Sequence, residues 1–179
     1  MHNMVKTKKA MIKYSNNFFK VLERSVNLNN MNHNYFSVDK ADVVVIIPIT
    51  NDGKIILERQ FRPAINKSIY EVPAGNIEEG ETPQNAALRE LKEETGYRAG
   101  KLIYLAKIYG SPGILSETQH LFLATRLRKG ERHLDPTEDI KIKAVSKSVA
   151  MDMILNKKIN DAKTMVAILY LNAFSDLFK

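Results

Sequence analysis

Residues 75–97 read GNIEEGETPQNAALRELKEETGY, and this stretch decides the fold of the chain. Six glutamates lie between Gly75 and Gly96, although the 179-residue chain carries a net charge of +7. Such a concentration of carboxylates in a basic protein favours a hard divalent cation, because Mg²⁺ takes oxygen ligands. The ordinary alternative is a solvated, glutamate-rich surface helix.

The residue types at both ends of the stretch predict a helix over residues 82–95. Thr82 is a good N-cap, and Pro83 suits the first helical position, where its missing N–H costs nothing. Gly96 suits the position just after the last turn.

Three glutamates of this helix, Glu90, Glu93 and Glu94, are three and four residues apart and therefore share one flank. Like charges at these spacings destabilise an isolated helix, whereas a bound cation reverses the sign of that interaction. A lone pair of glutamates would fit a surface helix, but the regular spacing of glycine, glutamate and arginine around them does not.

The stretch resembles the Nudix box, in which these residue types recur at fixed spacings. The matching positions are Gly75, Glu81, Arg89, Glu90, Leu91, Glu93, Glu94, Gly96 and Tyr97, the last being aromatic rather than aliphatic. The resemblance implies a Nudix hydrolase with an α/β fold, an α/β/α sandwich around a mixed sheet. It also implies that Glu90, Glu93 and Glu94 bind Mg²⁺, with Mn²⁺ as a substitute, and that Arg89 orients Glu81 or Glu93.

The composition fits one globular domain with a small appendage. The chain is 44% hydrophobic and has no cysteine, which excludes disulfides, thiolate catalysis and cysteine-based zinc sites. The basic residues are spread along the chain without interleaved aromatics, so we expect a phosphate substrate and no nucleic-acid partner. We find neither a membrane-spanning run nor a secretory signal, so we expect no membrane partner and a cytoplasmic protein.

Strand-prone runs punctuated by turn residues organise the rest of the chain. The runs at 18–26 and 35–38 predict an N-terminal β-hairpin extension, with residues 1–12 mobile. The β-branched run at 41–49 is typical of a strand buried on both faces. Further strands are expected at 54–60, 68–72, 101–109, 119–124 and 140–145, and two helices begin after the caps Ser146 and Asp161.

The loop at 111–117, which follows the strand expected at 101–109, indicates one branch of the family. Ser111-Pro112-Gly113 alone is explained by turn chemistry. Together with Ser116-Glu117 and the box, it resembles the Ser-Pro-Gly-x-x-Ser-Glu loop of the ADP-ribose pyrophosphatase branch. Residues 58–62, 71–75 and 158–162 resemble further stretches of that branch. The resemblance implies a homodimer that forms through an N-terminal tail and hairpin at 1–40, followed by the hydrolase domain at 41–179.

Roles in substrate binding follow from this resemblance and from side-chain chemistry. The Arg62 guanidinium suits a phosphate oxygen, with a surface salt bridge as the alternative. Glu117 would accept hydrogen bonds from the terminal ribose, and the Ala74 carbonyl would complete the Mg²⁺ shell. The remaining residues expected to bind substrate are Glu71, Ser111, Pro112 and Gly113. Candidates to stack on adenine are Phe18, Phe19, Tyr35 and Phe36, which equally suit a core or an interface.

The catalytic base is expected in the loop at 134–139. The branch carries an acidic run there, and Pro136 stands where one of its glutamates is expected. We assign Glu138 as the base or an additional metal ligand, with Asp135 in reserve. The expected catalytic set is therefore Arg89, Glu93 and Glu138.

The predicted reaction is Mg²⁺-dependent hydrolysis of the pyrophosphate bond of ADP-ribose to AMP and ribose 5-phosphate. One alternative is hydrolysis of another nucleoside diphosphate sugar, such as GDP-mannose or UDP-glucose. Another is a non-catalytic nucleotide-binding regulator, against which the intact set of Glu90, Glu93 and Glu94 argues.

Overall fold

The computed structural model of the chain describes residues 9–134 and 139–174, which divide into two compact units. The first contains the residues up to Asp42 together with Tyr109–Thr118. The second contains Val43–Ile108 and the residues from Gln119 onward. The loop at 109–118, expected within the domain at 41–179, thus clusters with the N-terminal strands.

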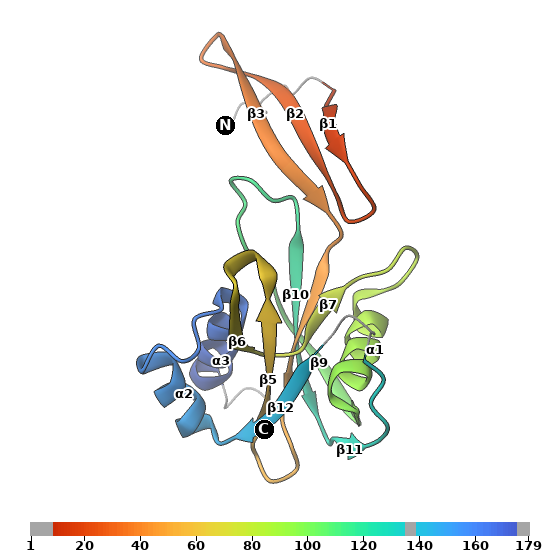
Figure 1. Cartoon of the computed structure of the whole chain (residues 1–179), viewed down its shortest axis with the longest axis vertical. Coiled ribbons are helices and arrows are strands. Elements are labelled where there is room, and N and C mark those ends of the chain that lie inside the picture. The colour runs from red at the N-terminus through yellow and green to blue at the C-terminus, as the bar shows by residue number, and fades with distance from the viewer. Residues whose placement is uncertain (1–8, 135–138, 175–179) are drawn as a thin grey trace. The chain divides into compact units, whose positions relative to one another are not determined.

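Two sheets form the centre of the second unit (Figure 1). The first has the order β7 (Ala74–Asn76), β4 (Val43–Pro48), β10 (Thr118–Thr125) and β9 (Lys101–Tyr109). It is mixed, because β4 runs parallel to β10 and antiparallel to β7. The second sheet is antiparallel, with the order β12 (Ile140–Val145), β5 (Ile55–Arg62) and β6 (Lys67–Glu71). A 3₁₀ turn, η1 (Pro63–Ile65), follows β5, and the short strands β8 (Tyr97–Arg98) and β11 (Arg128–Lys129) pair with each other.

Helices cover both faces of this centre, with α1 (Pro83–Thr95) on one side and α2 (Lys147–Leu155) and α3 (Ala162–Ala173) on the other (Figure 1). Every residue of β4 is buried, as its β-branched run predicts. Its alternate side chains belong to different cores: Val43, Val45 and Ile47 pack with α2 and α3, and Val44 and Ile46 pack with α1. The predicted α/β/α sandwich with a mixed sheet is confirmed. None of the helices in the described part of the chain is long and apolar enough to span a membrane.

The first unit contains three antiparallel strands, β1 (Met11–Ser15), β2 (Phe19–Leu28) and β3 (Met31–Lys40). The hairpin predicted at 18–26 and 35–38 was therefore too short, and Met11 and Ile12, expected in a mobile tail, belong to β1, while residues 1–8 of that tail lie outside the described residues. The connection between β2 and β3 is only Asn29-Asn30, both with left-handed φ of 51° and 61°. Such a two-residue turn matches strand twist, and asparagine tolerates it, so both strands extend to the turn.

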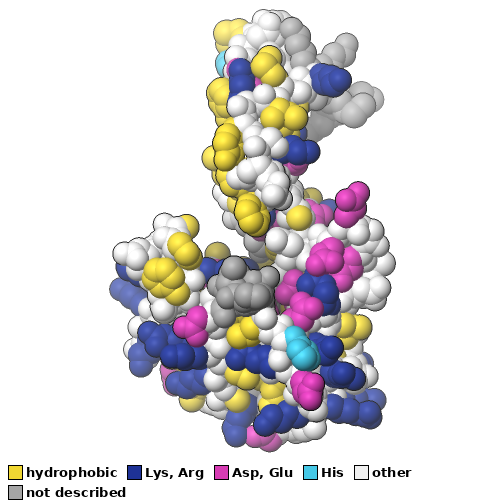
Figure 2. Space-filling model, turned by 45° about the vertical axis from the view of Figure 1, so that its right-hand side comes forward, with side chains coloured by type: hydrophobic (Ala, Val, Ile, Leu, Met, Phe, Trp, Pro, Cys, Tyr) yellow, Lys and Arg dark blue, Asp and Glu magenta, His cyan; other side chains and the backbone are white. Residues whose placement is uncertain are grey.

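The strands of the first unit bury little apolar surface. Leu22 is the only buried residue in β1, β2 and β3. Large apolar side chains instead line one visible side of this unit (Figure 2). The large apolar residues that are exposed in this unit include Met11, Ile12, Tyr14, Phe18, Phe19, Met31, Tyr35 and Phe36.

Candidate active site

Helix α1 forms as its end residues predict. The Thr82 hydroxyl accepts a hydrogen bond from the backbone N–H of Asn85 at 3.3 Å, and Pro83 occupies the first turn. Gly96 has a φ of 76°, and its N–H donates to the Lys92 carbonyl at 2.8 Å. The glutamate flank therefore has a fixed start and a fixed end.

Arg89 lies at the centre of the carboxylates. Its Nε and Nη2 donate to the two oxygens of Glu81 at 3.0 and 2.9 Å, and its Nη1 donates to Glu90 at 2.7 Å and Glu93 at 3.1 Å. Nη2 also donates to the Asn76 carbonyl at 2.9 Å, which ties the helix to β7. The bonds to Glu81 and Glu90 raise the pKa of Arg89, and in return Arg89 holds the pKa of Glu81 below its usual value.

Two of the glutamates lie against the chain where the helix meets β7. The Glu94 side chain is 3% exposed, and one of its oxygens accepts a hydrogen bond from the Ala74 N–H at 3.0 Å. The Glu90 carboxylate occupies the space that a Cβ at Gly75 would fill. Glycine at 75 is therefore required by the close approach of Glu90 to the backbone.

The donor set fits a hard divalent cation in its chemistry, because it consists of carboxylates on one helix flank, and two of them, Glu90 and Glu94, lie against the backbone of Gly75 and Ala74. Among residues 9–134 and 139–174, however, no three acidic or histidine side chains converge as a ready ligand cluster. Arg89 engages Glu90 and Glu93, and Glu94 is turned toward the Ala74 N–H. A bound cation would have to compete with these contacts.

Arg62 and Glu71 form a second charged feature of the same unit. Arg62 donates to one Glu71 oxygen from Nε at 3.0 Å and from Nη2 at 2.5 Å, and Nε also reaches the other oxygen at 3.3 Å. Burial alone would lower the pKa of Arg62, but its bonds to Glu71 and the charges of Glu71, Glu94 and Asp161 raise it. The guanidinium thus stays charged and forms a salt bridge with Glu71, whose side chain is 4% exposed, so the pair is partly buried and differs from the surface salt bridge weighed as the alternative.

Sequence reasoning missed the residues behind Glu71. Lys163 donates to Glu71 at 3.0 Å and lies 3.0 Å from Asp161, while the Thr164 hydroxyl accepts from the Val72 N–H at 2.9 Å. Asp161 was identified only as a helix cap. The capping residue type could reveal the start of α3. It could not reveal that Lys163 and Thr164 contact residues 92 positions earlier in the sequence.

The Ser111–Glu117 loop belongs to the first unit. Ser111 closes a tight turn, since its carbonyl accepts from the N–H groups of Ile114 at 3.0 Å and Leu115 at 2.8 Å. Strand β3 holds the loop, because Val38 donates to the Ile114 carbonyl and accepts from the Ser116 N–H. Ser111, Pro112 and Gly113 are exposed, whereas Glu117 is 7% exposed and forms an ion pair with Lys40.

The proposed base cannot be placed, because Glu138 and Asp135 lie outside the described residues. The chain on either side of them is anchored to other elements. His133 donates its N–H to the Glu93 carbonyl at 3.2 Å. Arg132 bonds the carbonyls of Glu94, at the end of α1, and Ile140, at the start of β12.

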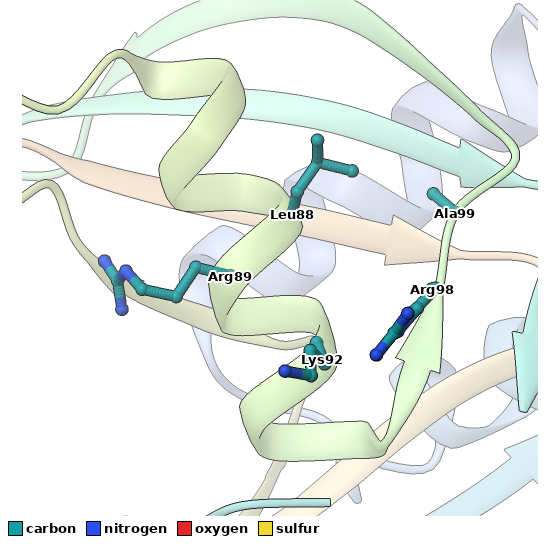
Figure 3. Close-up of a pocket in the computed structure, with 5 residues that line it drawn as sticks. All are labelled: Leu88, Arg89, Lys92, Arg98 and Ala99. Carbon is teal, nitrogen blue, oxygen red and sulfur yellow. The ribbon is translucent and has the colours of Figure 1, made fainter. Parts of the chain in front are cut away.

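A hollow of about 340 Å³ lies along α1, but it is not the carboxylate site. It is lined by Leu88, Arg89, Lys92, Arg98 and Ala99, and no acidic side chain is among these described lining residues. In Figure 3 the Arg89 side chain points away from Lys92 and Arg98. The chemistry of the glutamate flank therefore lies elsewhere on the helix.

Comparison with known proteins identifies the family. Residues 39–167 match the NUDIX domain, so the chain belongs to the Nudix domain family. An ADP-ribose pyrophosphatase of Bacillus subtilis (strain 168) is 42% identical over 136 residues, 75% of this chain and 74% of that protein. A methanol dehydrogenase activator of Bacillus methanolicus is 42% identical over 130 residues, 72% of this chain and 70% of that protein.

A solved structure agrees at the level of the fold. An ADP compounds hydrolase aligns with a TM-score of 0.87 at 22% sequence identity, covering 98% of this chain and 96% of that one. The predicted membership of the family, the fold class and the identification of the chain as a Nudix hydrolase are confirmed.

Proposed function

We propose that this Nudix hydrolase uses Mg²⁺ to cleave the pyrophosphate bond of ADP-ribose, releasing AMP and ribose 5-phosphate. The observation that carries the proposal is the approach of Glu94 to Ala74 and of Glu90 to Gly75, on the helix flank that also carries Glu93. The similarity to an ADP-ribose pyrophosphatase at 42% identity supports the choice of substrate.

Each residue has a proposed part in this reaction. Glu90, Glu93, Glu94 and the Ala74 carbonyl would hold Mg²⁺, with Mn²⁺ as a substitute, and Arg89 would orient the glutamates it bonds. When bound, the metal would neutralise negative charge on the pyrophosphate and lower the pKa of a bound water. Water then forms a bond to one phosphorus while the bridging P–O bond breaks.

The substrate contacts are proposed from the other charged residues. Arg62 would bind a phosphate oxygen through the part of its guanidinium that Glu71 does not occupy. Glu117 would accept hydrogen bonds from the ribose hydroxyls, with Ser111, Pro112 and Gly113 shaping its loop. We further propose that the protein acts in the cytoplasm as a homodimer.

A substrate panel tests the proposal. The full chain is incubated with ADP-ribose, GDP-mannose or UDP-glucose, with Mg²⁺ or with EDTA, and the products are separated and identified. We expect AMP and ribose 5-phosphate from ADP-ribose, the highest kcat/KM for that substrate, and no turnover in EDTA. A higher kcat/KM for either other sugar would transfer the proposal to that substrate.

One relative favours a second function. The methanol dehydrogenase activator is as similar in sequence as the pyrophosphatase, so a regulatory role is the alternative. Binding of ADP-ribose without any cleavage, at saturating Mg²⁺, would favour it.

We propose Glu138 as the base that accepts the proton of the attacking water. Glu138→Gln should then lower kcat strongly with little change in KM, and Asp135→Asn should be mild. The reverse ranking would move the base to Asp135. Full activity of both variants would move it to the box glutamates, with Glu93 the first candidate.

A further inference from the structure

Arg62, Glu71, Lys163 and Asp161 form a row of ion pairs with alternating charge. The proposed metal chemistry does not involve Lys163 or Asp161. We propose that Lys163 is a positioning residue of the substrate site, which holds Glu71 so that Glu71 presents Arg62 to a phosphate group of the substrate. This inference rests on the proposed function, because it assigns Arg62 to the diphosphate.

Lys163 fixes the orientation of the Glu71 carboxylate. Arg62 donates to one Glu71 oxygen at 3.0 and 2.5 Å and reaches the other from Nε at 3.3 Å, and Lys163 bonds that other oxygen at 3.0 Å. The Glu71 side chain is only 4% exposed, so water does not readily replace a lost partner. Lys163 is thus the second cation on the oxygen that Arg62 holds by its longest bond, and it restrains rotation of the carboxylate and with it the direction of the guanidinium.

Lys163 is itself held by the first turn of α3. Asp161 caps that turn by accepting from the Thr164 N–H at 3.0 Å and hydroxyl at 2.6 Å, and it also lies 3.0 Å from the Lys163 amine. The Thr164 hydroxyl accepts from the Val72 N–H at 2.9 Å. The first turn of α3 therefore bonds both the Glu71 side chain, through Lys163, and the backbone N–H of Val72, through Thr164.

Loss of the Lys163 charge would change how the N–H donors of Arg62 are shared between Glu71 and the substrate phosphate. Among the described residues, Glu71 would keep Arg62 alone as a cationic partner, so its carboxylate could turn and bond more of the guanidinium. Fewer N–H donors of Arg62 would then be available to a phosphate oxygen. Since a contact made equally in the ground and transition states affects KM rather than kcat, the expected defect is in KM.

The test is a double-mutant cycle in the full chain, with ADP-ribose and Mg²⁺. Lys163→Met should raise KM roughly tenfold with kcat within about threefold, whereas Lys163→Arg, which keeps the charge, should stay near wild type. In the Arg62→Ala background, Lys163→Met should add almost nothing, because its effect passes through Arg62. Lys147→Met, at an exposed lysine on the first turn of α2, is the matched control.

Several outcomes would overturn the inference. One is a tenfold effect of Lys163→Met that persists in the Arg62→Ala background, and another is a fall in kcat at unchanged KM. Thermal unfolding of each variant identifies any that do not fold. If Lys163→Met is among them, Lys163→Gln replaces it in the same cycle. A wild-type protein that does not hydrolyse ADP-ribose refutes the proposed function, whereas an active wild type with an additive cycle refutes only the role of Lys163.

Discussion

Arg89 shows, at the scale of single residues, why the box needs its particular side chains. One guanidinium bonds Glu81, Glu90 and Glu93, so three carboxylates face one cation. The excess of negative charge would be costly unless a further cation could share it. The sequence could predict the identity and flank of these glutamates from their spacing, but not that Arg89 would bond three of them at once.

The first prediction concerns Glu94. Glu94→Gln keeps the size and an oxygen for the Ala74 N–H, so the fold should be retained, while one negative ligand is lost. We expect kcat to fall roughly 10³-fold at saturating Mg²⁺. Glu79→Gln, at an exposed glutamate of the preceding loop, is the control and should be near wild type. Near wild-type turnover of Glu94→Gln would remove Glu94 from the ligand set.

The second prediction concerns Glu81 and pH. Arg89 lowers the pKa of Glu81, so this pair stabilises the fold above the ordinary pKa of glutamate, and the benefit is lost as the pH falls through the lowered value. Glu81→Gln should cost about 1 kcal/mol of unfolding free energy at neutral pH, discounted for partial exposure.

Denaturant unfolding of the wild type and of Glu81→Gln across a pH series measures the difference in their unfolding free energies. The gap between wild type and Glu81→Gln should narrow as the pH falls below about 4. Glu79→Gln, which removes an exposed carboxylate that Arg89 does not bond, is measured alongside as the control. A gap for Glu81→Gln that stays constant down to the acid transition would contradict the charge-based account.

At the scale of elements, the long runs were predictable and the long-range contacts were not. The caps Thr82, Ser146 and Asp161 all accept the hydrogen bonds that their positions predict. Local chemistry decides such ends, because a cap bonds a residue three positions away. The short strands β7, β8 and β11 escaped prediction, since strands of two or three residues exist only through the partners that the fold brings to them.

The third prediction concerns the contact between β7 and α1. Gly75→Ala places a Cβ in the space of the Glu90 carboxylate, so the glutamate or the helix must move. We expect about 1–3 kcal/mol of lost unfolding free energy, as for other overpacked sites, and at least about a tenfold loss of kcat. Shortening the side chain in Gly75→Ala/Glu90→Asp should restore part of the stability without restoring activity. A fully stable and active Gly75→Ala would show that Glu90 does not need this approach.

At the scale of the whole molecule, the expected site residues divide between two units. Arg62, Glu71 and the box belong to the second unit, and the Ser111–Glu117 loop belongs to the first, where β3 holds it. The sequence could identify both groups by their motifs. It could not show that the loop would cluster with the N-terminal strands, because this depends on pairing between Val38 and residues 114–116.

The last prediction is that the protein is a homodimer held by the first unit. A three-stranded sheet needs a covered apolar face to be stable, and these strands bury only Leu22 while Phe18 is 81% and Phe36 is 55% exposed. Such a surface on a second copy would supply the missing cover. Removal of all residues before Asp42 would also strip β3 from the loop, so substitutions within the full chain are the cleaner test.

Sedimentation at micromolar concentration measures the dimer. The wild type should sediment as a dimer, and Phe18→Ser/Phe36→Ser should weaken association at least about 30-fold if these aromatics anchor the contact, as aromatic hot spots do. Leu155→Ser removes a similarly exposed side chain, 72% accessible on α2, and should remain dimeric. Because both substitutions replace exposed residues, unfolding of the monomer does not explain a difference between them. A wild-type monomer at these concentrations would refute the dimer, and a dimer untouched by the Phe18 and Phe36 changes would place its interface away from the N-terminal sheet.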